Sequence, residues 1–178
     1  MPAQETMDRA NYPVTPAVRV LREKGIAFEP HLYEYKQHGG TKRSAEELGV
    51  DEHSVIKTLV METDSREPLI VLMHGDCEVS TKSLARTLGV KTVAPCDPVI
   101  AQKHTGYQVG GTSPFGTRKP LAVYAEKTIF DLAKIYINGG KRGFLVAIQP
   151  NDLRRALTVS EVNVKTGIAA GSSSEYKL

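Results

Sequence analysis

Cysteines and long apolar runs are scarce in this sequence, and each shortage excludes a class of protein. The 178 residues include two cysteines, Cys77 and Cys96, and no tryptophan. Two cysteines without a second pair nearby fit neither a disulfide framework nor a zinc ribbon, so we expect reduced thiols. No apolar run approaches the roughly 18 residues that suggest a membrane span, and the polar N-terminus lacks the apolar stretch of a secretory signal. The sequence therefore predicts a cytoplasmic protein with no membrane partner.

Metal-ligand spacing is also missing, and charge of one sign is not in large excess. The five histidines form no helical i, i+4 pair and have no flanking carboxylate in a metalloprotease pattern. The net charge is only +3, so composition alone does not indicate a nucleic-acid binder. We predict no metal, no cofactor and no DNA partner. The basic pairs are Lys42-Arg43, Arg118-Lys119, Lys141-Arg142 and Arg154-Arg155, of which the first three fall in stretches typical of loops.

Length and a hydrophobic content of 40% predict one domain with one core. We expect a flexible tail over residues 1–14, the domain over 15–160 and a C-terminal tail over 161–178. Capping residues and Gly or Pro boundaries predict helices at 16–24, behind a Ser44/Glu47 capping box, at 81–88, from Asp97-Pro98 to Gly106, and at 152–157. Apolar and β-branched runs predict strands at 27–35, 55–61, 69–73, 121–124, 135–138 and 144–148. This order predicts an α/β or α+β fold with a mixed, partly antiparallel sheet.

Three features are candidates for function. Lys57 interrupts an apolar strand, so its side chain either faces solvent or enters a pocket, and periodicity does not decide between them. The stretch 106–116 has four glycines and a proline; it could present N–H groups to an oxyanion or form a plain turn. The second glycine loop, 139–143, suits a phosphate or a simple hairpin turn. No Ser nucleophile elbow is present, and neither cysteine lies in a cysteine-hydrolase signature.

Four motifs taken together resemble one family. They are Thr-Pro-Ala-Val at 15–18, Val-Ile-Lys-Thr-Leu at 55–59, Gly-Tyr-Gln-Val-Gly-Gly-Thr-Ser-Pro at 106–114 and Ile-Tyr-Ile-Asn-Gly-Gly-Lys-Arg-Gly at 135–143. In this order they closely resemble the YbaK family of free-standing Cys-tRNA(Pro) deacylases, over residues 15–157. The resemblance implies a barrel-like mixed sheet surrounded by helices, which also occurs as the editing insertion of bacterial prolyl-tRNA synthetases.

The resemblance also implies a reaction. Family members release cysteine from mischarged tRNA(Pro), and the substrate's own thiol is thought to attack the ester carbonyl and leave as a cyclic thioester. Such an enzyme needs no nucleophile of its own, because positioning and electrostatics can supply the rate enhancement. The implied partners are the 3′ end of an aminoacyl-tRNA and prolyl-tRNA synthetase.

Site residues follow from the same motifs. Lys57 matches the family's functional lysine, and the loop from Gly110 to Pro114 matches its G-x-x-x-P loop. The implied catalytic groups are Lys57 and the backbone N–H groups of Gly110, Gly111 and Thr112. The implied substrate-binding residues are Tyr33, Thr58, Ser113, Pro114, Asn138, Gly139, Gly140, Lys141 and Arg142.

Two positions depart from the family pattern. Phe144-Leu145 stands where many relatives have Leu-Asp, and Asn138 replaces a common serine. The first change removes a carboxylate that could hold the substrate's amino group. Two alternatives therefore stay open: a deacylase for Ala-tRNA(Pro) or another small aminoacyl-tRNA, and a catalytically inactive module that binds tRNA or the synthetase.

Overall fold

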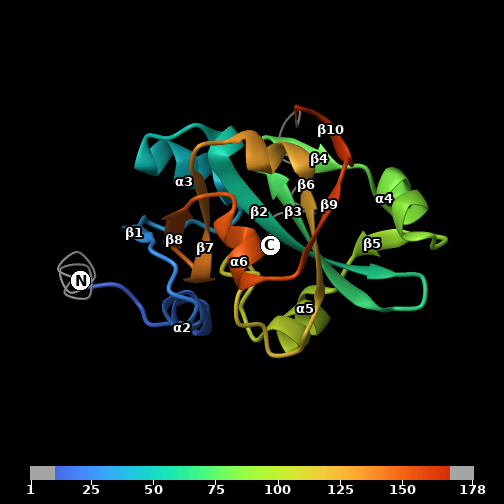
Figure 1. Ribbon diagram of the computed structural model, residues 1–178, viewed down its shortest axis with the longest axis horizontal. Helices are drawn as coiled ribbons and strands as arrows, with labels where there is room; N and C mark the ends of the chain where they lie inside the picture. The colour runs from blue at the N-terminus through green and yellow to red at the C-terminus, as the bar shows by residue number, and fades with distance from the viewer. Residues whose placement is uncertain (1–10, 169–178) are drawn as a thin grey trace.

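A computed structural model describes residues 11–168, which fold around one large mixed sheet (Figure 1). Its strand order is β1-β8-β7-β2-β3-β6-β9, and β5 pairs with β2 outside this path. The strands are β1 (Glu29–Leu32), β2 (Val55–Thr63), β3 (Pro68–His74), β5 (Val93–Pro95), β6 (Ala122–Glu126), β7 (Ile135–Lys141), β8 (Phe144–Ile148) and β9 (Val159–Val162). A second, two-stranded sheet joins β4 (Cys77–Val79) to β10 (Lys165–Ile168).

Strand direction confirms the predicted mixed sheet. β2 runs antiparallel to β3 and parallel to β7, and β6 runs parallel to both β3 and β9. β1 and β9 lie at opposite ends of the strand order, so the described sheet is open and forms no closed barrel.

The predicted caps produce most of the helices. The Thr15 hydroxyl accepts from the Val18 N–H to begin α2 (Pro16–Glu23), and the Asp97 carboxylate accepts from the Val99 N–H to begin α5 (Pro98–Thr105). α4 (Thr81–Leu88) ends at Gly89 in the left-handed conformation, which glycine adopts without strain. The described residues also form α6 (Asp152–Ala156) and the 3-10 helices η1 (Glu52–Ser54) and η2 (Lys127–Asp131).

The predicted capping box is wrong. α3 spans Gly40–Leu48, so Ser44 lies inside the helix and donates its hydroxyl to the Thr41 carbonyl. The Glu47 carboxylate accepts from the Glu34 N–H and pairs with Arg43 instead of turning back to a cap. The N-cap is Gly39, which provides no side-chain hydrogen bond, so the start of this helix is uncapped.

The predicted N-terminal tail ends too late in the chain, and the predicted C-terminal tail begins too early. Tyr12 stacks on Phe144 with ring centroids 5.9 Å apart, so the chain already packs on the domain before residue 14. At the other end, residues 159–162 pair with β6 and residues 165–168 pair with β4. The Glu126 carboxylate accepts the backbone N–H groups of Val164 and Lys165, which holds this segment to the domain. The rest of each predicted tail, 1–10 and 169–178, lies outside the described residues.

Apolar side chains fill both faces of the sheet. In β3, Ile70 and Leu72 belong to the larger cluster, which α2 covers, whereas Val71 and Met73 belong to the second cluster beside α4. This alternation follows from the two-residue period of a strand. Within residues 11–168 no helix has the length and apolar character needed to cross a membrane.

Candidate active site

A cleft opens where β2 and β7 separate. β2 pairs with β7 only at Val55 and Ile56, and along the same edge it pairs with β5 from Met61 onward. The cleft encloses about 670 Å³, its open mouth included. It is lined by Tyr33, Tyr35, Lys36, His38, Gly40, Thr41, Arg43, Ser44, Val55, Ile56, Lys57, Thr58, Gly110, Thr112, Asn138 and Leu145.

The loop 106–116 forms one wall of this cleft and is anchored at several points. The buried Tyr107 hydroxyl donates to the Phe115 carbonyl at 2.6 Å, which closes the loop across its own base. The Arg142 guanidinium donates to the Val109 carbonyl at 2.7 Å. The loop is therefore held in one shape before any ligand binds.

Asn138 joins the loop to the β7–β8 hairpin. Its amide NH₂ donates to the Gly110 carbonyl at 3.2 Å, while its amide oxygen accepts from the N–H groups of Gly140 and Lys141 at 2.7 and 3.2 Å. These bonds lie at an irregularity in the pairing of β7 with β8 between Asn138 and Lys141. One side chain thus fixes both a wall of the cleft and the bulge behind it.

Gly110 lies directly against Tyr35. Its φ of +85° is in the left-handed region, and a Cβ built there would lie 2.7 Å from the Tyr35 hydroxyl oxygen. The Arg142 guanidinium lies 5.1 Å from the centre of the same tyrosine ring, within cation–π range. Glycine is favoured at 110 because φ is positive and a Cβ would displace the Tyr35 ring.

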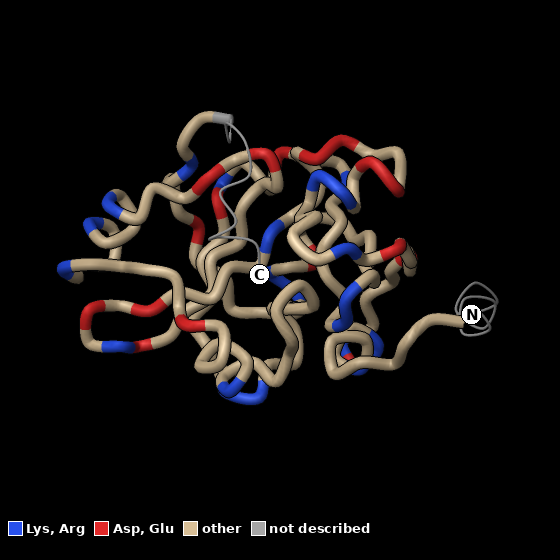
Figure 2. The backbone as a smooth tube through the Cα atoms, turned by 180° about the vertical axis from the view of Figure 1, so that it is seen from behind, with Lys and Arg blue, Asp and Glu red and all other residues tan. Residues whose placement is uncertain are grey.

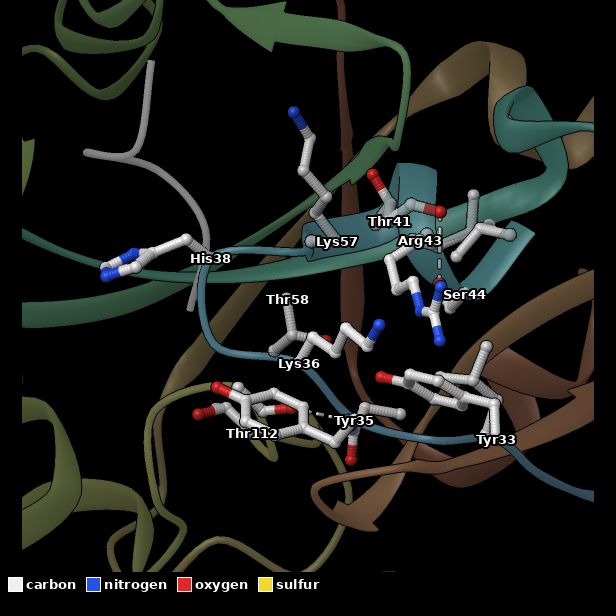
Figure 3. Close-up of a pocket in the computed structure, with 16 residues that line it drawn as sticks. Tyr33, Tyr35, Lys36, His38, Thr41, Arg43, Ser44, Lys57, Thr58 and Thr112 are labelled. Carbon is white, nitrogen blue, oxygen red and sulfur yellow. Dashed lines mark hydrogen bonds between the residues drawn. The ribbon is translucent and has the colours of Figure 1, made fainter. Parts of the chain in front are cut away.

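Lys57 is buried, with 9% of its surface exposed, and it lines the cleft. Its ammonium donates to the Cys77 carbonyl oxygen at 2.5 Å. Figure 3 shows the side chain directed away from Tyr33 and Tyr35. Of the two positions that periodicity allowed, the structure shows the buried one.

Thr58, the next residue along β2, offers an unused hydroxyl. The residue is 2% exposed, and its Oγ1 has no hydrogen-bond partner within the described chain. A buried polar atom without a partner costs free energy, so such an atom beside a cleft is suited to meet a ligand. Across the cleft, burial raises the pKa of Tyr33, which keeps its hydroxyl protonated and able to donate.

The lining is cationic and apolar. Among the described residues, those that line the cleft include Lys36, Arg43 and Lys57 but no aspartate or glutamate. Leu145 and Val55 supply apolar surface. Arg43 is held from outside the cleft by Glu34 and Glu47 at 3.6 and 3.2 Å. Figure 2 shows the other basic residues at several places around the molecule instead of in one stripe.

The start of α3 adds to the positive character. Gly40 and Thr41, its first residues, line the cleft, and the preceding Gly39 gives no side-chain cap. Uncapped N–H groups and the positive end of the helix dipole favour an anion there. The cleft thus has an anion-binding end near α3 and Lys57, and an uncharged end at Thr58 and the loop.

The structure brings some of the predicted site residues together in the cleft and leaves the others out of its lining. Tyr33, Lys57, Thr58, Gly110, Thr112 and Asn138 line the cleft. The Gly111 N–H donates to the Gln108 carbonyl at 2.9 Å, so it does not face a substrate. Ser113 is fully buried and its hydroxyl accepts from the Phe115 N–H. The other residues outside the lining are Pro114, Gly139, Gly140, Lys141 and Arg142.

Sequence reasoning missed the wall formed by residues 35–44. Tyr35, Lys36, His38, Thr41, Arg43 and Ser44 all line the cleft. The Lys42-Arg43 pair was a signal, but it was assigned to a loop, whereas it lies in α3. Starting the helix at Ser44 hid the uncapped N-terminus that faces the cleft.

Comparisons with known proteins find relatives in both sequence and fold. The family model described as the aminoacyl-tRNA editing domain matches residues 39–156. EbsC of Enterococcus faecalis, provisionally named a Cys-tRNA(Pro)/Cys-tRNA(Cys) deacylase, is 27% identical over 76% of this chain and 84% of its own. The proline–tRNA ligase of Brachyspira hyodysenteriae is 29% identical over 48% of this chain but only 15% of the ligase. A crystal structure titled as a candidate trans-editing enzyme for prolyl-tRNA synthetase superposes with a TM-score of 0.74 at 20% identity, covering 87% of this chain and all of that one.

Proposed function

Because the chain belongs to the aminoacyl-tRNA editing domain family, we propose that it is a trans-editing deacylase that releases cysteine from Cys-tRNA(Pro) in the cytoplasm. The observation that carries the proposal is the two-ended cleft. One end suits a phosphate of the tRNA 3′ end, and the other presents neutral hydrogen-bonding groups to an ester.

The terminal nucleotide fits the anion-binding end. In the proposed complex its phosphate lies between the start of α3, at Gly40 and Thr41, and the Lys57 ammonium, which leaves the Cys77 carbonyl or shares its protons with the phosphate. Lys57 then positions the substrate by charge and takes no part in bond making.

The ester fits the neutral end. Within the described residues the N–H groups of Gly110 and Thr112 donate to no protein acceptor, so they can receive the carbonyl oxygen as negative charge develops on it. Thr58 can accept from the substrate's ammonium, since no carboxylate of residues 11–168 lines the cleft.

The substrate supplies the nucleophile in this mechanism. The cysteine sulfur attacks the ester carbonyl carbon, a C–S bond forms, and the bond from carbon to the ribose oxygen breaks. The thiol proton ends on the ribose oxygen, which leaves a cyclic thioester and tRNA with a free 3′ end. Ser44, the one serine among the described lining residues, donates to the Thr41 carbonyl and is not paired with a base. Positioning and the N–H groups carry the rate enhancement.

The test is a deacylation panel with separately prepared Cys-, Ala- and Pro-tRNA(Pro). We expect loss of cysteine well above the buffer rate, with Lys57→Ala slowed by at least about tenfold, the value of a lost charged hydrogen bond. The matched control is Lys82→Ala, an exposed lysine on α4, which should behave as the parent protein. No release of any amino acid above buffer would refute the enzymatic proposal.

The panel also separates the alternatives. Release of alanine but not cysteine would assign the small-aminoacyl specificity that the apolar Leu145 position leaves open. Replacing the substrate cysteine by serine should abolish thiol-driven cyclisation but not hydrolysis that depends on pocket fit. Tight, salt-sensitive tRNA binding without turnover would indicate an inactive module. Prolyl-tRNA synthetase is the proposed partner, because the matching relatives include proline–tRNA ligases.

A further inference from the structure

Three potential metal ligands converge beside η1 and the turn between β3 and β4. His53 Nδ1 lies 2.8 Å from Asp76 Oδ1, and the Cys77 thiol donates to the same carboxylate oxygen at 3.3 Å. One ligand atom from each of the three residues falls within 4.8 Å of the others, and the part of the chain that the structure describes contains no second such group. Cys77 is buried, but the His53 and Asp76 side chains are 32% and 26% exposed, so an ion can enter from solvent.

Neighbouring groups hold this constellation in place. The His74 ring stacks on the His53 ring with centroids 3.7 Å apart, and its nitrogens bond to the His53 carbonyl and the Thr128 hydroxyl. Gly75 lets η1 approach the turn, because a Cβ there would lie 2.8 Å from the Glu52 carbonyl oxygen. Outer contacts of this kind fix the orientation of ligands in metal sites.

We propose that His53, Asp76 and Cys77 form a binding site for a divalent transition-metal ion of the zinc type. Imidazole nitrogen, carboxylate oxygen and thiolate sulfur are ligands that Zn²⁺ accepts, and three of them with solvent in the fourth position complete a tetrahedral site. On binding, the thiol proton leaves to solvent, and the imidazole keeps its proton on Nε2 so that Nδ1 can coordinate. One cation thus takes the place now held by the hydrogen bonds that converge on Asp76 Oδ1.

Sequence spacing could not have predicted this site. His53 is far from Asp76-Cys77 along the chain, and neither part matches a metal-binding motif. The antiparallel pairing of β2 with β3, which places Ile56 opposite His74, brings the end of η1 to the turn after β3.

The site lies next to the cleft through Cys77. The carbonyl of this residue holds the Lys57 ammonium. The hydroxyl of Thr41, another lining residue, bonds to the Glu52 carboxylate at 2.8 Å and lies 3.2 Å from the Gly75 carbonyl oxygen. An ion bound to the Cys77 sulfur would fix the backbone that anchors Lys57. If the proposed deacylase function holds, Zn²⁺ should therefore change the deacylation rate.

Cobalt(II) titration of the full chain, without a tag and after chelator treatment, tests the site with no need for tRNA. We expect one equivalent of Co²⁺ to bind with a thiolate-to-cobalt charge-transfer band, and one equivalent of Zn²⁺ to displace it. Cys77→Ser should abolish the band, while the matched control Cys96→Ser should keep it. His53→Gln and Asp76→Asn should each weaken binding by more than about tenfold.

Two results of the cobalt titration would overturn the proposed site. One is the absence of a thiolate band at stoichiometric Co²⁺, and the other is a band that survives in Cys77→Ser. Circular dichroism shows whether each variant is folded, and His53→Gln, at a partly exposed side chain, keeps the test decisive if Cys77→Ser does not fold. Because the readout is the metal's own spectrum, failure of the site and failure of the deacylase proposal are told apart.

Discussion

Replacing Thr58 with valine should stabilise the protein and slow its reaction at the same time. The two side chains have nearly the same shape, so the change removes the hydroxyl and little else. The Thr58 hydroxyl is buried without a partner, and an unpaired buried polar group costs about 1–3 kcal/mol. We expect the free energy of unfolding in urea to rise by about 1 kcal/mol, the low end of that range.

The effect on the reaction depends on what the hydroxyl meets in the complex. A hydrogen bond to a charged group contributes about 1.5–3 kcal/mol. If Thr58 accepts from the substrate's ammonium, kcat/KM for Cys-tRNA(Pro) should fall by roughly 10- to 150-fold, at about 1.4 kcal/mol per factor of ten. Single-turnover deacylation at limiting tRNA measures this loss directly.

Thr63→Val, in the same strand, is the control. The Thr63 hydroxyl bonds to Ser65 and to the Glu67 N–H, so its removal should destabilise the fold by about 1 kcal/mol. Activity should stay near that of the parent because Thr63 does not line the cleft. A Thr58→Val protein that is less stable than the parent would contradict the unpaired state of this hydroxyl. One that deacylates at the parent rate would refute the assignment of the hydroxyl to the substrate.

Three further changes test other parts of the site. Gly110→Ala should cost about 1–2 kcal/mol of stability, since φ is +85° and the new methyl meets Tyr35; an unchanged urea midpoint would contradict this conformation. Tyr107→Phe should cost about 1 kcal/mol through the lost bond to Phe115, and deacylation should slow as the loop loosens, so full activity would show that the anchor is dispensable. Burial raises the pKa of Tyr107 from 10.0 to about 12, so its contribution to stability is complete below pH 10 and is lost as pH rises from 10 through 12. The free energy of unfolding in urea should therefore depend less on pH in this range in Tyr107→Phe than in the parent protein. Leu145→Asp should strengthen binding of aminoacyl esters with a free ammonium, and equal KM values for Cys-tRNA(Pro) in both proteins would place the ammonium elsewhere.

Local chemistry explains which parts of the fold could be predicted. α4 and α5 were predicted where they occur because Gly89 ends the first and Asp97 caps the second. The β2–β3 pair is defined by two apolar runs around a polar turn. The start of α3 was missed because a glycine N-cap leaves no side-chain signal and Ser44 imitates one. The segment after residue 158 was missed because its short strands depend on β6, β4 and Glu126, which are distant in sequence.

The site divides in the same way. Lys57 and the Gly110 loop stood out locally, as a charge in an apolar strand and as a glycine-rich stretch. Tertiary packing decides the hydrogen bonds of these groups. Lys57 bonds to the Cys77 carbonyl, the Gly111 N–H donates to the Gln108 carbonyl, and the Thr58 hydroxyl has no partner among the described residues. Motif matching could therefore indicate which segments meet, but not which atoms remain available.

The three hydrogen bonds of Asn138 have a consequence for how this cleft can evolve. The amide donates to Gly110 and accepts from Gly140 and Lys141 at once, and a serine hydroxyl, with a single proton and a shorter reach, cannot replace all three. A change at 138 therefore alters the loop and the bulge together. We expect a single substitution of Asn138 by serine to be disfavoured unless the β7–β8 hairpin changes with it. The loop 106–116 and this hairpin should therefore be inherited together, and transferring either one alone into a relative should disrupt the cleft wall.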